Sequence, residues 1–404
     1  MREPGFSAFE KRVKRHVIAR PRAFFVSAPP GFEQISAREL AWDGFIETGD
    51  TVCEKGGVLF TGRVHDGYAA NLHLRTANRV LMRIDEVSAQ NFRRLGKKVE
   101  DIPWELYLYP DVPIRISVTT RRSRLYHTDA VSKCVRAGIE ARIANATSKG
   151  AGLFSDFRRP QRVFVRGFED VFTISLDSSG ELLYKRGLKS HGGKAPIRET
   201  LAAAILLFSG FRPGDLLVDP MCGSGTFSLE AAMMSTHTPA GWFRDFAFMG
   251  WPCFRRTRWE YMRRQSESRI VFPKEPVIWA CDLDPNACRR LERTVSAHGF
   301  SSAVSVLKRD FFDLLPSLLD GMPQKNSKRL LVLNPPYGRR MSAKMQPDDF
   351  YAEIGKKLAC DFKNWRVAIL APGRKLAAKM PFLVRVYPVF HGGLSLWLFL
   401  GRVC

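Results

Sequence analysis

The sequence predicts an α/β protein whose C-terminal half folds around a largely parallel sheet. In that half, short apolar runs alternate with segments long enough for helices, and the runs lie at 216–219, 277–281, 330–333, 367–370 and 394–400. A glycine-rich turn separates the first run from a helical stretch over 227–234. Strands that alternate with helices form parallel sheets that bind ligands at the carboxyl ends of the strands.

The N-terminal half is predicted to hold smaller α/β units, since 404 residues suffice for two or three domains. Apolar spacing predicts helices over 32–42, 68–80 and 128–146, and strands over 24–26, 58–60, 114–119, 162–168 and 171–176. A stretch rich in Gly and charge before a helix predicted over 197–209 marks the main boundary. The predicted domains are a basic arm (1–22), a first α/β unit (23–65), a second α/β unit (66–178), a linker (179–195) and the parallel-sheet domain (196–404).

The chain is strongly basic, with 63 Lys and Arg against 40 Asp and Glu and a net charge of +23. Most of the excess lies in residues 181–404. Such a charge attracts nucleic acid by displacing counterions, although lysines that only aid solubility would give the same sum.

The cysteines and the apolar stretches indicate in which cellular compartment the protein is expected. None of the eight cysteines forms a CxxC pair, so we expect free thiols in a reducing cytoplasm and no metal site. The longest uncharged apolar stretch, 201–211, is too short to cross a membrane. The N-terminus lacks the apolar core of a secretory signal, whereas an organelle transit peptide stays open.

The run DPMCGSGT, from Asp219 to Thr226, follows the first strand of the parallel sheet and opens a helix. Gly223 and Gly225 permit a sharp turn with a ligand held against the main chain, although a purely structural turn would look the same. No P-loop lysine follows, which leaves nicotinamide and adenosylmethionine cofactors as the candidates.

Carboxylates follow the next two strands of this domain. Asp282 ends the second strand and can accept both hydroxyl protons of a ribose. Asp284, in the turn, can instead cap the next helix. Asp310 follows a third apolar run, where it can accept from an adenine amino group or cap a helix.

A motif at the end of a fourth strand decides between these cofactors. Asn334, Pro335, Pro336 and Tyr337 place an amide, two imino acids and an aromatic ring together. The Asn334 side-chain oxygen and the Pro335 carbonyl can accept both hydrogens of a planar NH₂ group, while Tyr337 offers a surface on which a base stacks. Holding those protons turns the nitrogen lone pair towards an electrophilic methyl, so positioning replaces a titrating base.

Basic residues surround this motif, and Arg339, Arg340 and Lys344 are the candidates for contact with a phosphate backbone. A second cluster, over 251–264, mixes arginines with Trp and Tyr. It fits a base-stacking surface or a helix with a solvated basic face.

The sequence resembles the THUMP-domain class I RNA methyltransferases, and among them the bacterial 23S ribosomal RNA guanine-N2 methyltransferases. The resemblance covers most of the chain and rests on the runs 194–204, 219–227, 230–232, 281–284 and 334–338, with weaker likeness at 56–60 and 176–187. It departs from the family in its basic arm and in the absence of the second methyltransferase domain of longer, fused members.

The resemblance implies a ferredoxin-like unit at 23–65, an RNA-docking THUMP domain at 66–178 and a Rossmann-like class I methyltransferase domain at 196–404. It implies S-adenosylmethionine as cofactor and a guanine N2 of 23S rRNA as acceptor. Carried over by position, Gly223, Gly225 and Thr226 contact the methionine end, with Asp219 in the same loop. Asp282 then binds the ribose, Asp310 the adenine, and Asn334 to Tyr337 the target amine.

Three alternatives stay open, together with the expectation of a monomer. A transfer-RNA guanine-N2 methyltransferase would use the same two modules. An adenine-N6 methyltransferase acting on DNA shares the motif at Asn334 but needs no THUMP domain. A non-catalytic RNA-binding or ribosome-assembly protein could keep the fold and the charge.

Overall fold

The computed structural model describes residues 8–42, 44, 51–147, 157, 159–188, 197–319, 328–336 and 346–404. Its contacts divide the chain into two compact units. Unit 1 comprises Met1–Ala28, Ser36–Leu183 and Arg244–Arg263, and unit 2 comprises Pro29–Ile35, Tyr184–Phe243 and Arg264–Cys404. The units interleave along the sequence, so neither is one continuous stretch of chain.

Unit 1 is built on a seven-stranded sheet in the order β2-β3-β1-β4-β7-β6-β5. Only β5 and β6 pair in parallel; the other neighbours are antiparallel. The strands are β1 (Arg22–Ser27), β2 (Thr51–Glu54), β3 (Gly57–Gly62), β4 (Arg79–Ser88), β5 (Ile114–Arg121), β6 (Gln161–Phe168) and β7 (Val171–Asp177). One sheet thus runs through both of the smaller α/β units predicted from the sequence, and the boundary between residues 65 and 66 stays a prediction.

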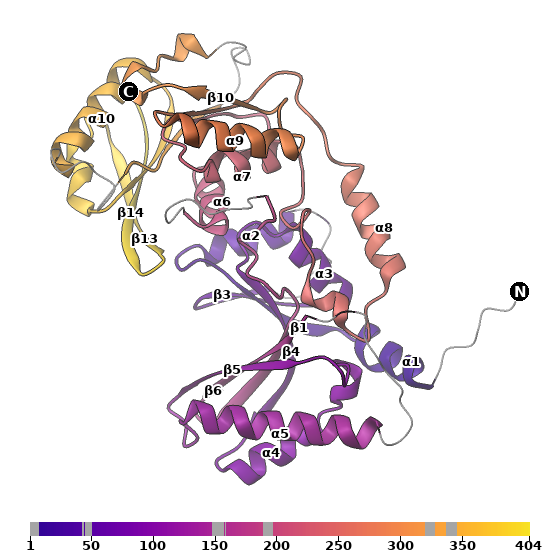
Figure 1. Cartoon of the computed structure of the whole chain (residues 1–404). Coiled ribbons are helices and arrows are strands. Elements are labelled where there is room, and N and C mark those ends of the chain that lie inside the picture. Colours follow the sequence, from indigo (N-terminus) through magenta and orange to yellow (C-terminus); the bar gives the residue numbers. More distant parts are fainter. Residues whose placement is uncertain are drawn as a thin grey trace, which may run out of the picture. The chain divides into compact units, whose positions relative to one another are not determined.

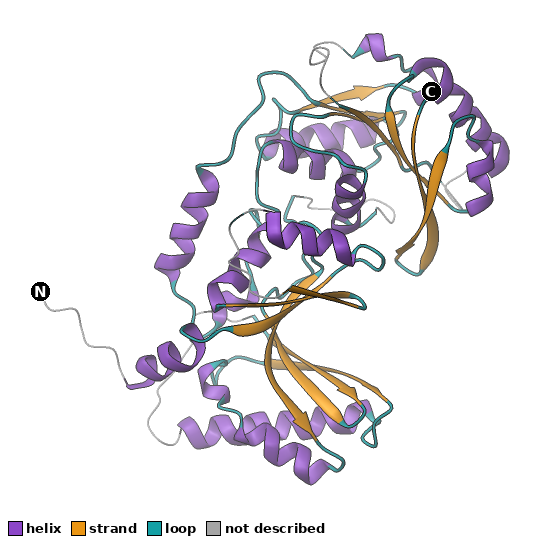
Figure 2. Cartoon of the chain, turned by 180° about the vertical axis from the view of Figure 1, so that it is seen from behind, coloured by secondary structure: helices purple, strands orange, loops and turns teal. Residues whose placement is uncertain are grey.

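Figure 1 labels four helices of unit 1, and Figure 2 shows the chain from behind. They are α1 (Ala8–Val13), α3 (Val64–His73), α4 (Phe92–Asp101) and α5 (Thr128–Thr147), with a π-helical turn at Lys14–Ile18 and 3₁₀ turns at Trp104–Leu106 and Ala247–Gly250. In α5 the buried Val131, Val135, Gly138 and Ile139 recur at helical spacing. A Cβ on Gly138 would come within 2.9 Å of Val99 Cγ1, so this glycine allows α4 and α5 to pack closely.

Residues 244–263 pack within unit 1. The Trp251 Nε1–H donates to Gln161 Oε1 at 2.9 Å, and Phe248 stacks on Tyr68 at 4.1 Å between ring centroids. Trp251 and Trp259 are buried. The base-stacking interpretation of this cluster is therefore wrong for both tryptophans, since their rings are core. Helix α8 (Arg256–Glu267) follows and leaves Tyr261 exposed.

Unit 2 holds a second seven-stranded sheet, in the order β10-β9-β8-β11-β12-β14-β13. The first five strands are parallel, whereas β14 and β13 are antiparallel to their neighbours. This agrees with the prediction of a largely parallel sheet. The strands are β8 (Leu216–Asp219), β9 (Ile278–Asp282), β10 (Val304–Lys308), β11 (Arg329–Leu333), β12 (Arg366–Ala371), β13 (Val384–His391) and β14 (Leu394–Arg402).

The central strands of unit 2 are buried on both faces. Leu217 of β8 belongs to a core shared with α6 (Glu199–Phe208), α7 (Thr226–Ser235) and α9 (Pro285–Ala297). Its neighbours Leu216 and Val218 point into a second core, shared with α10 (Pro347–Asp361). Helices on both faces of a parallel sheet define a doubly wound fold, and they explain why β8 reads as an unbroken apolar run.

One predicted helix had wrong bounds, and some elements were not predicted. The helix predicted over 68–80 ends at His73, because Arg79 already begins β4, which pairs with both β1 and β7. The prediction also missed β2, which is short, α4, which is polar, and β13, for which the structure offers no such reason. Helix α2 (Glu33–Trp42) and the remaining strands lie within two residues of the predicted cores of these elements.

Candidate functional site

The candidate site lies at the carboxyl edge of the unit 2 sheet, where the strand order changes direction. From β8 the sheet grows through β9 and β10 on one side, and β11 begins the other side. The parallel register brings the strand ends together, since Val218 of β8 is level with Trp279 of β9 and with Leu331 of β11. Open α/β sheets bind ligands at such a switch point.

The glycine turn after β8 leaves room for a ligand against the main chain. Gly223 and Gly225 have φ angles of 53° and 69°, which side chains rarely adopt. The Gly225 N–H donates to the Cys222 carbonyl at 2.7 Å, and α7 begins at the next residue. A Cβ on Gly223 would meet only open space, whereas one on Gly225 would come within 2.3 Å of Leu291 Cδ1. Gly223 therefore suits a close ligand, and Gly225 lets α7 pack on α9.

Asp282 joins the end of β9 to the glycine turn. Its Oδ2 accepts from the Gly223 N–H at 2.7 Å, and its Oδ1 accepts from the Asp284 N–H at 2.9 Å. These bonds fix the carboxylate, and each oxygen keeps a second lone pair for a hydroxyl donor. The geometry suits the predicted contact with the two hydroxyls of a ribose.

Asp284 and Asp310 both act as caps in this structure. Asp284 accepts from the Asn286 N–H at 2.8 Å at the start of α9, which is the alternative role predicted for it. Asp310 accepts from the Phe312 N–H at 3.0 Å at the start of a 3₁₀ turn. The helix-cap role of Asp310 is thus present, and its contact with an adenine stays a prediction.

Asp219 is held by a residue that the sequence analysis missed. It is 1% exposed at the end of β8, and its Oδ2 accepts from the Ser228 hydroxyl at 2.7 Å. Thr226, at the start of α7, is buried, and its Oγ1 lies 3.3 Å from Ser224 Oγ. Ser228 lies on the apolar helix α7, close behind the glycine turn. A lone serine at such a position was the signal in the sequence for a buried hydrogen-bond partner.

The carboxylates give this edge a negative potential. Burial, with further contributions from Asp219 and Asp282, holds the pKa of the Cys222 thiol well above its usual range. Burial and Asp219 likewise raise the pKa of Cys281, and burial and Asp282 raise that of Cys288. The three thiols are therefore neutral at pH 7 and unsuited to nucleophilic attack. The same potential favours a cationic ligand group, such as a sulfonium.

Asn334 is the first residue after β11. Its side-chain Oδ1 is buried and accepts no hydrogen bond from any residue that the structure describes. A buried amide oxygen without a donor costs about 1–3 kcal/mol, so such an atom calls for a partner. Pro335 beside it is buried and Pro336 is half-buried. The arrangement suits an acceptor for an N–H donor that a ligand supplies.

Four of the predicted site residues lie outside the described residues: Tyr337, Arg339, Arg340 and Lys344. Their predicted roles, stacking on the base and contact with phosphate, stay predictions. Asp219, Gly223, Asp282 and Asn334 are described, and they lie at or just after the carboxyl ends of three adjacent strands of one sheet.

An ion pair that the sequence analysis missed supports the helix behind the glycine turn. Arg186 and Glu230 are both almost fully buried, with Nε and Oε1 2.9 Å apart and Nη2 and Oε2 3.2 Å apart. Breaking a buried pair of this kind costs about 3–5 kcal/mol. A glutamate inside the apolar helix α7 was the signal for a buried partner.

Within the residues that the structure describes, no three His, Cys, Asp or Glu side chains cluster as metal ligands. No helix in the described part of the chain combines the length and the apolar character needed to cross a membrane.

The doubly wound sheet, its glycine turn and the polar residues at three strand ends define a class I methyltransferase, the class whose methyl donor is S-adenosylmethionine. The chain belongs to the RMKL-like methyltransferase family, whose domain model matches residues 186–392. Residues 23–81 match the RlmL ferredoxin-like domain. The predicted fold class and family are thereby confirmed, whereas the assignment of 66–178 to a THUMP domain stays a prediction.

Curated relatives cover nearly the whole chain. The chain is 31% identical over 385 residues to the ribosomal RNA large subunit methyltransferase K/L of Syntrophotalea carbinolica, which covers 93% of this chain and 53% of that protein. It is 29% identical to the protein of the same name from Allochromatium vinosum, over 91% of this chain and 50% of that protein. The chain thus spans about half the length of these relatives.

Solved structures share the fold over both units. One, described as "a putative methyltransferase complexed with SAH", has a TM-score of 0.82 and 25% identity, over 95% of this chain and 99% of that chain. Another, a "predicted N6-adenine-specific DNA methylase" from Listeria monocytogenes, has a TM-score of 0.83 and 25% identity, over 96% of this chain and 97% of that chain.

Proposed function

We propose that the protein transfers a methyl group from S-adenosylmethionine to the exocyclic N2 of a guanine in 23S ribosomal RNA. The observation that carries this proposal is the buried Asn334 Oδ1, which lacks a donor among the described residues. Asn334 directly follows β11, the strand next to the one that leads into the glycine turn. The names of the relatives, which act on the RNA of the large ribosomal subunit, support the choice of substrate.

The cofactor would be held by the carboxyl edge of β8, β9 and β10. S-adenosylmethionine supplies an electrophilic methyl on a positively charged sulfur. Gly223 gives it room against the main chain, Asp282 accepts from the ribose, and Asp219 contributes to the negative potential that attracts the sulfonium. Asp310 is the proposed partner of the adenine.

The target nitrogen is a poor nucleophile because its lone pair is delocalised into the guanine ring. Asn334 Oδ1 and the Pro335 carbonyl would accept its two protons and so fix the direction of the lone pair. This role needs no group that titrates near neutral pH, because orientation and electrostatics lower the barrier. Tyr337 would stack on the base, and Arg339, Arg340 and Lys344 would contact the backbone.

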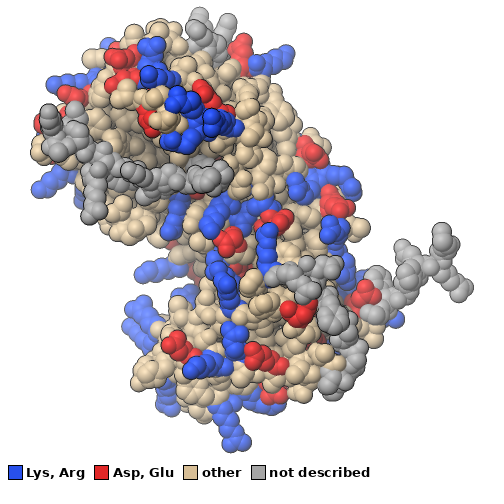
Figure 3. Space-filling model, viewed as in Figure 1, with Lys and Arg blue, Asp and Glu red and all other residues tan. Residues whose placement is uncertain are grey.

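The charge of the whole chain supports a polyanionic substrate. Basic side chains are spread over the face shown in Figure 3, with acidic ones interspersed among them. We expect a monomer in the cytoplasm, where ribosomal RNA is available. A transfer RNA remains the second candidate substrate, since one fold serves both kinds of RNA.

The first test replaces Asn334 by alanine. Removal of the acceptor is expected to lower methyl transfer to 23S rRNA by at least about 100-fold, the range assigned to one electrostatic contact in a transition state. Binding of S-adenosylhomocysteine and of RNA should stay within a few fold. The matched control is Asn91→Ala, which removes an asparagine that caps α4 in unit 1 and leaves the site intact. Unchanged turnover in Asn334→Ala would contradict the proposed mechanism.

The substrate is identified by mass spectrometry of nucleosides from a strain that lacks the gene. Loss of N2-methylguanosine from 23S rRNA alone supports the proposal, and loss from transfer RNA alone assigns the second candidate. Loss of N6-methyladenine from DNA would assign the DNA methyltransferase that the Listeria structure is named for. Retention of every methylated base would support a non-catalytic protein.

A further inference from the structure

The basic arm of the chain contributes to a pocket that the proposed catalytic site does not use. Residues 8–22 precede both family models, the first of which begins at residue 23. The arm consists of α1 and the π-helical turn at Lys14–Ile18, and it is anchored by Val13 and Val17, which are fully buried. Arg12 Nη2 of the arm also lies 2.7 Å from Glu105 Oε1. The arm is therefore a packed part of unit 1.

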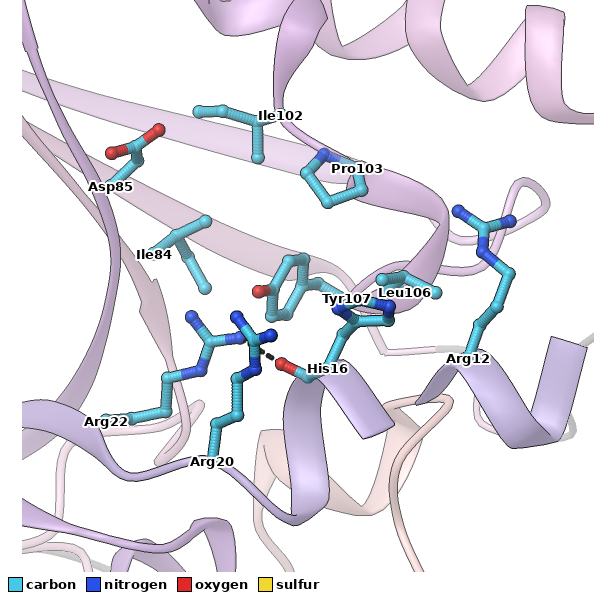
Figure 4. Close-up of a pocket in the computed structure, with 10 residues that line it drawn as sticks. All are labelled: Arg12, His16, Arg20, Arg22, Ile84, Asp85, Ile102, Pro103, Leu106 and Tyr107. Atoms are coloured by element: carbon cyan, nitrogen blue, oxygen red, sulfur yellow. Dashed lines mark hydrogen bonds between the residues drawn. The ribbon is translucent and has the colours of Figure 1, made fainter. Parts of the chain in front are cut away.

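A cavity of about 330 Å³ lies between this arm, β4 and the residues that lead into the 3₁₀ turn at Trp104–Leu106 (Figure 4). Four basic side chains line it: Arg12, His16, Arg20 and Arg22. Asp85 is the one carboxylate of the lining, beside apolar or aromatic residues such as Tyr107. Figure 4 shows Arg20, Arg22 and His16 gathered beside the Tyr107 ring.

The charges of the pocket are not balanced. Arg12 is neutralised by Glu105, but this carboxylate also binds Arg142, with Nε and Oε2 2.9 Å apart. Arg22 donates to the His16 carbonyl and lies over the Tyr107 ring, with its Cζ 5.6 Å from the ring centroid. Its Nε is buried and has no hydrogen-bond partner among the residues that the structure describes. Among the described residues of the lining, the pocket therefore carries more positive than negative charge.

The pKa of His16 is sensitive to the positive charge of the pocket. Burial lowers the pKa of this imidazole, and the charges of Arg20, Arg15, Arg12 and Arg22 lower it further. An anion in the pocket would offset these charges and raise the pKa of His16 again.

The pocket suits a phosphate group of a nucleic-acid backbone better than a nucleic-acid base or a free anion. Tyr107 is only 3% exposed, so no base can stack on its ring. Outside the pocket, the arm carries the exposed basic residues Lys11, Lys14 and Arg15. A run of exposed cations beside an anion pocket is complementary to the phosphate backbone of a nucleic acid.

We propose that this pocket binds a backbone phosphate of the substrate RNA, so that the arm is part of the RNA-binding surface. The identity of the polyanion as RNA rests on the proposed function. The phosphate contact itself stands on the pocket and on the four basic residues that line it.

The experiment measures binding of a 23S rRNA transcript to the full chain at several salt concentrations, without S-adenosylmethionine. Arg20→Gln is the principal variant, because Arg20 is exposed at the pocket and its loss should leave the fold intact. We expect the affinity to fall about three- to tenfold, and the slope of log K against log salt to decrease by about 0.7–0.9, the value of one phosphate contact. Arg20→Lys should restore most of the slope.

The control is Lys363→Gln, which removes the same charge from an exposed position in unit 2. If Arg20→Gln binds RNA with the affinity and slope of Lys363→Gln, the proposal is overturned. A second readout is the NMR titration of the His16 ring, whose signal is assigned by its absence in His16→Gln. The pKa of His16 should rise when RNA binds. If AMP or inorganic phosphate raises that pKa and RNA neither raises it nor competes, the pocket binds a free anion and the RNA contact is wrong.

The outcomes separate the two proposals. Because binding is measured without a methyl donor, a chain that binds RNA through Arg20 but methylates none would refute the proposed function alone. A chain that methylates 23S rRNA with an unchanged salt slope in Arg20→Gln would refute the pocket alone.

Discussion

Gly223 and Gly225 are two residues apart, yet they are expected to respond differently to an added methyl group. Gly223→Ala places a Cβ in open space beside the main chain, where the ligand is proposed to lie. We expect binding of S-adenosylhomocysteine to weaken about tenfold or more, a loss of ~1.4 kcal/mol. Isothermal titration calorimetry measures this change.

Gly225→Ala should instead act on stability. Both glycines have a positive φ, so alanine is strained at either position, but only at Gly225 would the new Cβ also overlap Leu291 Cδ1 at 2.3 Å. This overpacking costs about a further 1–3 kcal/mol, so the thermal midpoint should fall below that of Gly223→Ala. Equal midpoints, with both variants losing the ligand equally, would contradict the separate roles of the two glycines.

At the level of residues, the sequence indicates the positions of the site but not the partners of its side chains. The spacing of strands and polar residues located Asp282 and Asn334, because strand ends of a parallel sheet meet at one edge. The bond from Gly223 to Asp282 joins residues 59 positions apart, and no local pattern encodes it. The same reason hid Ser228 from the analysis: its partner Asp219 comes from the preceding strand.

The arm of unit 1 depends on one carboxylate. Burial raises the pKa of Glu105, but hydrogen bonds from Arg142 and Arg12 outweigh burial and leave the pKa below its usual value of 4.5. A carboxylate with a lowered pKa in the folded state adds stability above the unfolded pKa, and this stability is lost as the pH falls below about 4.5.

We therefore expect Glu105→Gln to lower the free energy of unfolding of unit 1 by about 2 kcal/mol at pH 7, the cost of losing a charged hydrogen-bond acceptor. The difference between the variant and the unchanged protein should shrink as the pH falls below 4.5. Urea unfolding from pH 7 to 3.5, with hydrogen exchange over residues 8–18 as a local readout, measures both effects. A difference that does not vary with pH would show that Glu105 is uncharged in the folded protein.

At the level of elements, apolar periodicity predicted long helices and buried strands well. Helix α5 was predicted over 128–146 and observed over Thr128–Thr147, because its buried positions recur without interruption. Helix α3 was extended too far, because Leu74 and Ala77 continue its apolar spacing towards Val80, which belongs to β4. Helix α4 was missed because only Leu95 and Val99 of its ten residues are buried.

At the level of the whole molecule, the predicted domains were all continuous segments of the chain. Local patterns report which element a segment forms and not which core it joins. Residues 244–263 follow α7 of unit 2 and yet pack in unit 1. The predicted linker over 179–195 stays a prediction. The unit changes after Leu183, and no local pattern indicated that residues 244–263 would pack in unit 1 again.

The contribution of residues 244–263 to unit 1 can be tested with a fragment of residues 1–195. The fragment lacks Trp251 and Phe248, so Gln161 and Tyr68 lose a hydrogen bond and a stacked ring. We expect it to be less stable than unit 1 in the full chain and to gain stability when a peptide of residues 244–263 is added. Circular dichroism with and without the peptide measures this gain. A fragment that melts like the full chain and ignores the peptide would contradict the role of the segment.

The return of residues 244–263 to unit 1 also sets the order of events during translation. The ribosome makes β8 and α7 before it releases the aromatic residues that complete the earlier core. A nascent chain paused before residue 244 therefore exposes apolar side chains around Tyr68, for which chaperones compete. Codon changes that slow synthesis just upstream of Arg244 should lower the yield of native protein more than the same changes downstream of Arg263.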